Sequence, residues 1–199
     1  VIDAAKGIEP QTLKLFEVCR LRSVPIITFI NKVDREGQTP FELLDEVADR
    51  LALDVCPMNW PAGMGGQFEG IYDLVDPALM VPGGDASRMY EGERIAVEGL
   101  EDPRLAAKLS APALALLKEE TELASACYAP FDGTAYRNGD LTPVFFGSAL
   151  KEFGVVDLLA GLANHAPGPQ PQPAEPAPVR PDDDAVTGFV FKVQANMNP

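Results

Sequence analysis

The sequence is poor in histidine and cysteine. It contains one histidine, His165, which leaves little scope for histidine-based catalysis or metal binding. The three cysteines, Cys19, Cys56 and Cys127, are odd in number and far apart in the chain. They therefore match neither a disulfide framework nor a zinc-binding pattern, and they are typical of a reduced, cytoplasmic protein.

Long apolar runs and basic residues are also scarce. No stretch reaches the roughly 20 apolar residues of a membrane-spanning helix, and no signal peptide is visible, so we expect no membrane partner. The chain has 16 Lys and Arg against 30 Asp and Glu, a formal net charge of −14. This excludes a broad positive surface for sequence-specific DNA, and an RNA or ribosome partner would have to meet local patches. The acidity favours solubility, and we expect a monomer.

Both ends of the sequence look cut. The chain starts with Val1 inside an apolar strand pattern, and it stops within the strand-like run FVFKVQANMNP. We therefore expect an internal piece of a longer protein. An isolated copy would have marginal stability, because the edges of its sheet would be exposed.

The first third of the chain alternates between strand and helix patterns. A truncated strand at residues 1–2 precedes a helical pattern over 11–22. The β-branched run Val24–Ile30 is typical of a buried parallel strand. A second helix is expected over about 39–53. This order predicts an α/β fold with a mostly parallel sheet and helices on both faces.

The second of these helices carries a clear start signal. Thr39 is a plausible N-cap, and Pro40 suits the first helical turn. Glu42 lies three residues after Thr39, as in a capping box. The pattern predicts a helix that begins at Pro40.

The middle of the chain, roughly 57–142, breaks the alternation. It is rich in turns, with short strand-like pieces around 68–74. A helical region over about 103–128 follows, which Pro112 is expected to kink or divide. We interpret this segment as an insertion in the α/β domain.

The alternation then resumes and ends at a linker. A buried strand at Val144–Phe146 and an amphipathic helix over 155–164 complete a first domain, residues 1–166. Residues 167–184 are rich in proline and predict a semi-rigid, extended linker. The apolar run within 185–199 predicts the first strand of a second domain.

Three polar residues follow the strand Val24–Ile30: Asn31, Lys32 and Asp34. In open α/β sheets, ligands bind beyond the carboxyl ends of the strands. A carboxylate accepts two parallel hydrogen bonds, and guanine offers two donors, its N1–H and its 2-amino group, which adenine lacks. We expect Asp34 to read guanine, the stem of Lys32 to lie over the base, and Asn31 to bond the base and a neighbouring loop.

A second loop supports this interpretation over simple polar capping of a strand. Ser148, Ala149 and Leu150 follow the second buried strand, and small residues in a tight loop expose backbone N–H groups. We expect one of these groups to donate to guanine O6 and Ser148 to hold Asp34. The two loops together predict a guanine pocket, and we assign no catalytic or metal-binding residue.

These motifs resemble those of the translational GTPases. NKVD, residues 31–34, is similar to the fourth guanine-nucleotide box of that family, and GSAL, residues 147–150, to its fifth. The stretch 57–74 resembles the start of an insertion shared with elongation factor G, and residues 189–199 resemble the opening of a β-barrel domain. The resemblance covers essentially the whole chain.

The resemblance implies a P-loop NTPase-type G domain that binds GTP and GDP, with Mg²⁺ in the intact protein. It also implies a cytoplasmic GTPase that acts on the ribosome in translation termination and promotes release of the class I release factors, which read stop codons. An elongation factor G-like translocation GTPase is one alternative. A degenerate G domain that binds partners without hydrolysis is another.

The chain departs from the family pattern where phosphate should bind. It contains no G-x-x-x-x-G-K-[ST] loop, and its glycine-rich residues 63–67 lack the required Lys and Ser or Thr, so we interpret them as a turn. We assign no switch threonine, and the Asp-x-x-Gly match at residues 34–37 lies in the loop already assigned to guanine, so Mg²⁺ and the attacking water have no visible ligands. We expect this piece alone not to hydrolyse GTP.

Overall fold

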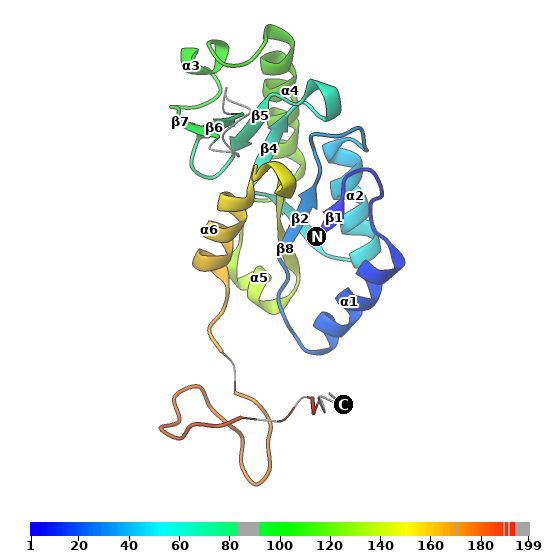
Figure 1. Cartoon of the computed structure of the whole chain (residues 1–199), viewed down its shortest axis with the longest axis vertical. Helices are drawn as coiled ribbons and strands as arrows, with labels where there is room; N and C mark the ends of the chain where they lie inside the picture. Colours follow the sequence, from blue (N-terminus) through cyan, green and yellow to red (C-terminus); the bar gives the residue numbers. More distant parts are fainter. Residues whose placement is uncertain (83–91, 170, 189, 191, 194–199) are drawn as a thin grey trace, which may run out of the picture. The chain divides into compact units, whose positions relative to one another are not determined.

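The chain forms two compact units, residues 1–166 and 167–199, which are described separately. In the second unit the described residues carry no helix or strand, apart from an isolated bridge between Gln172 and Val179. The strand predicted within 185–199 is absent from the described part of that run, and its other residues lie outside the description. The computed structural model describes residues 1–82, 92–169, 171–188, 190, 192 and 193 (Figure 1).

A parallel sheet lies at the centre of the first unit, with the strand order β1-β2-β8-β3. The observed β2 is shorter than its predicted run, because Pro25 has no N–H to donate and the N–H of Val24 bonds the carbonyl of Cys19 instead (3.0 Å). The α/β prediction is confirmed. The four strands are β1 (Ile2–Asp3), β2 (Thr28–Asn31), β3 (Asp54–Pro57) and β8 (Leu141–Gly147).

Helices cover both faces of this sheet (Figure 1). Successive residues of β8 point to opposite sides: Val144 and Phe146 join the core that contains α2, whereas Phe145 joins a smaller cluster with residues of α5 and α6. The sheet is therefore the middle of three layers. The helices that flank it are α1 (Pro10–Leu21), α2 (Pro40–Leu51), α5 (Gly133–Asn138) and α6 (Val155–His165).

Helix α2 begins as its sequence predicts. The backbone N–H of Glu42 donates to the hydroxyl of Thr39 (3.3 Å), and the backbone N–H of Thr39 donates to the carboxylate of Glu42 (2.8 Å). The first helical residue is Pro40, whose missing N–H has no partner to lose at this position. The capping box is confirmed.

A second, antiparallel sheet lies in the chain between β3 and β8, with the order β4-β5-β6-β7. The predicted helix over 103–128 is two helices, and the break falls before Pro112, because Ser110 caps the second one through the N–H of Ala113 (3.3 Å). The elements of this segment are β4 (Asn59–Ala62), the 3-10 turn η1 (Gly65–Gln67), β5 (Gly70–Asp73), β6 (Ala78–Val81), β7 (Glu93–Ala96), α3 (Pro103–Ala106) and α4 (Ala111–Cys127).

One buried cluster joins the two sheets. Trp60 on β4 is fully buried between the rings of Phe41 on α2 (centroids 4.9 Å apart) and Phe146 on β8 (5.7 Å). Its indole N–H donates to the carboxylate of Glu120 on α4 (2.8 Å). The antiparallel sheet is thus packed directly onto the α/β part of the unit.

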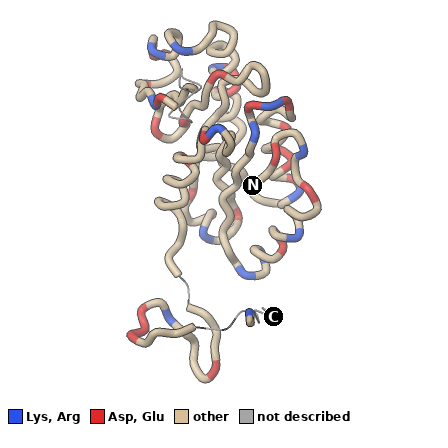
Figure 2. The backbone as a smooth tube through the Cα atoms, viewed as in Figure 1, with Lys and Arg blue, Asp and Glu red and all other residues tan. Residues whose placement is uncertain are grey.

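Charged residues of both signs are spread over the first unit. Figure 2 shows Lys and Arg positions interspersed with Asp and Glu positions along its backbone. Mixing of this kind favours solubility over attraction to one highly charged partner.

Candidate nucleotide-binding site

Three strand ends meet at the carboxyl edge of the parallel sheet. The register places Asp3 of β1 beside Asn31 of β2, and Asn31 beside Gly147 of β8. The residues that follow each strand therefore emerge at the same level of the sheet. This edge is where open α/β sheets bind ligands.

Asn31 connects the two predicted guanine loops. Its side-chain oxygen accepts the backbone N–H of Lys32 (2.9 Å) and that of Ala149 (2.8 Å). The second bond is the contact with a neighbouring loop expected of Asn31. It fixes the start of one loop against the other.

Lys32 extends toward β1. Its φ of +69° is left-handed, and its ammonium lies 2.5 Å from the carboxylate of Asp3. The hydrogen bond from Lys32 is the main cause that lowers the pKa of Asp3, although partial burial opposes it. The ion pair anchors the end of the lysine stem, so the stem is held beside the place where the strands end.

Asp34 is the most unusual group of the site. Its side chain is only 8% exposed, and its Oδ2 lies 3.1 Å from the ammonium of Lys151. Burial alone would raise the pKa of Asp34, but the Ser148 hydroxyl and Lys151 outweigh it and lower that pKa below its usual value. Its Oδ1 is buried without a hydrogen-bond partner in the described residues. A charged, buried and unpaired acceptor is costly unless a ligand donates to it.

The loop after β8 is tightly closed. The backbone N–H and carbonyl of Ser148 pair with those of Phe153 at 3.0 Å each, which leaves Ala149 and Leu150 at the exposed tip. The neighbouring Gly147 allows this closure, because a Cβ there would stand 2.3 Å from the carbonyl oxygen of Phe153. Ser148 itself is buried, as a residue that supports Asp34 should be.

Sequence reasoning missed two members of this cluster. Neither Asp3 nor Lys151 was assigned a role from the sequence. Asp3 ends β1 and Lys151 follows β8, two strands of the same parallel sheet, so the position of Asp3 at a strand end was the available signal. Lys151 reaches Asp34 only because of the turn at Ala149–Lys151, which the sequence pattern does not specify.

The described residues contain no group of three or more His, Cys, Asp or Glu side chains arranged to hold a metal ion. Within the same described ranges, no helix is long and apolar enough to cross a membrane.

The family match identifies the class of nucleotide-binding domain to which this fold belongs. Residues 1–168 match the family model of the elongation factor Tu GTP binding domain. The chain therefore belongs to this family of GTP-binding domains.

The chain is also similar to individual proteins of known sequence or structure. The chain is 46% identical, over all of its 199 residues, to peptide chain release factor 3 from Symbiobacterium thermophilum, and it spans 38% of the length of that protein. A solved structure from Thermus thermophilus is similar in fold, with a TM-score of 0.58 and 20% identity. That similarity covers 85% of this chain and 26% of the other, and at this identity it shows the fold alone.

Proposed function

We propose that the chain carries the guanine-recognition half of the nucleotide site of a translational GTPase that acts in termination. The observation that carries the proposal is Asp34, whose side chain is only 8% exposed and whose Oδ1 is buried without a hydrogen-bond partner among the described residues. It stands at the carboxyl edge of the sheet in a chain of the GTP-binding family. Guanine supplies the two parallel donors that such a carboxylate accepts.

The surrounding residues support this role for Asp34. Ser148 is buried and stabilises the carboxylate, and Asn31 ties the loop of Ala149 to the end of β2. Lys151 shares Asp34 Oδ2 in the free protein, and it is 45% exposed, so its ammonium is able to move into solvent when a base arrives. The stem of Lys32 then lies over the base, and the tip at Leu150 closes around O6.

The proposal extends to the layout of the protein. Residues 1–166 form the C-terminal part of a G domain with an insertion over about 57–142, residues 167–184 form a linker, and residues 185–199 begin a β-barrel domain. The boundary between the two compact units supports the first of these divisions.

We also propose the task of the intact protein. The likeness to a release factor supports a monomeric cytoplasmic GTPase whose partners are the ribosome and class I release factors. Hydrolysis needs a phosphate loop, switch elements and Mg²⁺ ligands; this sequence has no G-x-x-x-x-G-K-[ST] loop, and we assign it no switch element or Mg²⁺ ligand. The chain alone therefore binds at most the base side of the nucleotide and does not hydrolyse GTP.

Competition for a fluorescent GDP derivative tests the proposal. The complete gene product is titrated with unlabelled GDP and then with ADP under identical conditions. We expect ADP to compete at least about a hundredfold less well, because adenine would leave the buried Asp34 carboxylate unpaired. Equal competition by GDP and ADP would contradict the guanine-specific site and the proposed function that rests on it.

A further inference from the structure

The loop that follows β8 lacks a strand on one side. β8 pairs with β2 as far as Gly147, but it pairs with β3 only as far as Val144, because the chain leaves the sheet after Pro57. The last backbone bond on that side runs from the N–H of Met58 to the carbonyl of Val144 (2.9 Å). Phe146, two residues before Ser148, therefore has no strand partner there among the described residues.

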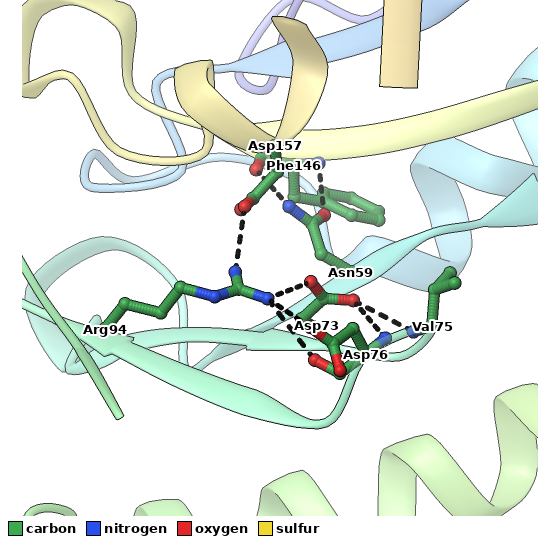
Figure 3. A network of polar contacts seen from close by, with 7 residues as sticks. All are labelled: Asn59, Asp73, Val75, Asp76, Arg94, Phe146 and Asp157. Carbon is green, nitrogen blue, oxygen red and sulfur yellow. Dashed lines mark hydrogen bonds and ion pairs between the residues drawn. The ribbon is translucent and has the colours of Figure 1, made fainter. Parts of the chain in front are cut away.

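The side chain of Asn59 takes the place of that missing strand. Its Oδ1 accepts the N–H of Phe146 (2.7 Å), and its Nδ2 donates to the carbonyl of Phe146 (3.1 Å) (Figure 3). Asn59 and Phe146 are both buried, so these bonds are shielded from water. Asn59 is also the first residue of β4, so the antiparallel sheet begins at this contact.

The antiparallel sheet also contacts the chain that follows the loop after β8. Arg94 on β7 donates to Asp157 in the first turn of α6 (3.1 Å) and to Asp73 on β5 (2.8 Å) (Figure 3). The ring of Phe68, just before β5, meets the ring of Phe153 edge-on at 5.6 Å. The antiparallel sheet and the residues that lead into β5 thus contact the loop at three places. Asn59 contacts Phe146 before the loop, Phe68 contacts Phe153 within it, and Arg94 contacts Asp157 after it.

The other guanine loop is held from the same segment. The N–H of Gly65 donates to the carbonyl of Val33 (2.9 Å), which lies between Lys32 and Asp34. The N–H of Gly66 donates to the carboxylate of Glu36 (3.2 Å). Both loops that we assign to guanine therefore rest on the residues that follow Pro57.

We propose that the antiparallel sheet positions the guanine loops, with Asn59 and Arg94 as its positioning residues, and that it thereby sets the rate at which guanine nucleotide leaves. The inference rests on the proposed function. Neither residue touches the base; each acts through the backbone or helix that flanks residues 147–154. A displacement of the antiparallel sheet loosens that loop and speeds release.

Dissociation of fluorescent GDP from the complete gene product tests the inference. Asn59→Ala removes both bonds to Phe146, and we expect release at least about tenfold faster, because the loss of a single buried hydrogen bond already corresponds to about tenfold. Arg94→Ala is expected to speed release several-fold, and Arg94→Lys less, because a single ammonium keeps the charge without the two-sided fork.

Matched controls separate positioning from a general loss of stability. Thr142 lies on β8, at the end of the strand away from the loop. Thr142→Val removes the buried hydrogen bond between its hydroxyl and the hydroxyl of Thr28 on β2 (2.9 Å). Arg104→Ala breaks the ion pair between the half-exposed Arg104 and Asp102 within the insertion. Both controls are expected to leave the dissociation rate unchanged, even where the melting temperature falls.

The outcomes distinguish this inference from the proposal beneath it. If folded Asn59→Ala releases GDP at the wild-type rate while Asp34→Asn loses affinity, the guanine site stands and the positioning role is wrong. If Asp34→Asn keeps full affinity, the guanine site itself fails. If Asn59→Ala does not fold, Arg94→Ala decides by the same criterion, and an unchanged rate there overturns the inference.

Discussion

At the residue scale, two buried carboxylates behave in opposite ways. Asp34 and Asp157 each have one oxygen without a hydrogen-bond partner in the described part of the chain. The pKa of Asp34 is lowered, because Ser148 and Lys151 outweigh its burial. The pKa of Asp157 is raised, first by burial and then by the negative charge of Asp73, against the attraction of Arg94. The folded protein thus favours the charged form of Asp34 and disfavours the charged form of Asp157 in the first turn of α6.

This difference predicts how stability depends on pH at Asp157. A raised pKa means that the folded state binds the proton more tightly than the unfolded state, so the gain is present at low pH and is lost as pH rises through the folded-state value. Asp157→Asn removes that loss. We expect the variant to be at least as stable as wild type at pH 7, with an advantage that shrinks as pH falls. Urea unfolding across this range measures it, and a variant that is less stable at pH 7 would show that the Arg94 pair dominates.

Residue positions were predictable only where they depend on nearby sequence. Asn31, Asp34 and Ser148 follow recognisable strands, so their positions at a sheet edge follow from the pattern. Asn59 and Phe146 are 87 residues apart, and Arg94 and Asp157 are 63 apart. Such pairs depend on how two sheets pack, which no local pattern specifies.

At the scale of elements, the start of α2 is specified by a capping box that spans four residues, Thr39 to Glu42. Removing the capping hydroxyl in Thr39→Ala leaves the N–H of Glu42 without its partner. We expect a loss of about 1 kcal/mol in the free energy of unfolding, measured with urea. Thr134→Ala, at an exposed threonine in the first turn of α5, is the control and should change it by less than about 0.5 kcal/mol. Equal losses in the two variants would contradict the role of the cap.

Most of the short strands were hard to predict, although β5 (Gly70–Asp73) falls within the strand-like pieces expected around 68–74. β3 through β7 have four residues each, which leaves little room for an alternating pattern. β3 ends in Pro57 and β4 contains Pro61, and proline argues against a strand. These strands form because their neighbours supply pairing and burial, which act between distant parts of the chain.

At the scale of the molecule, the first unit has a core that runs through both sheets. The main cluster includes Leu43 on α2, Trp60 on β4, Leu117 on α4 and Phe146 on β8. A cluster shared in this way couples the insertion to the α/β part, because neither side buries its apolar face without the other.

This shared core predicts a single unfolding transition for residues 1–166. Trp60 is the only tryptophan, and it lies in the insertion, so its fluorescence reports on that part, whereas far-UV circular dichroism reports on all helices. We expect the two signals to change at the same urea concentration. A tryptophan transition that precedes the circular dichroism transition would show that the insertion unfolds separately.

Asp34 is proposed to read guanine, and a change of nucleotide specificity tests this role most directly. Asp34→Asn in the complete gene product places an amide donor where guanine also has donors, whereas xanthine has an accepting carbonyl at that position. We predict that GDP affinity falls by about a hundredfold or more and that xanthosine diphosphate binds the variant better than GDP does. Unchanged GDP affinity in the folded variant would contradict the assignment of Asp34.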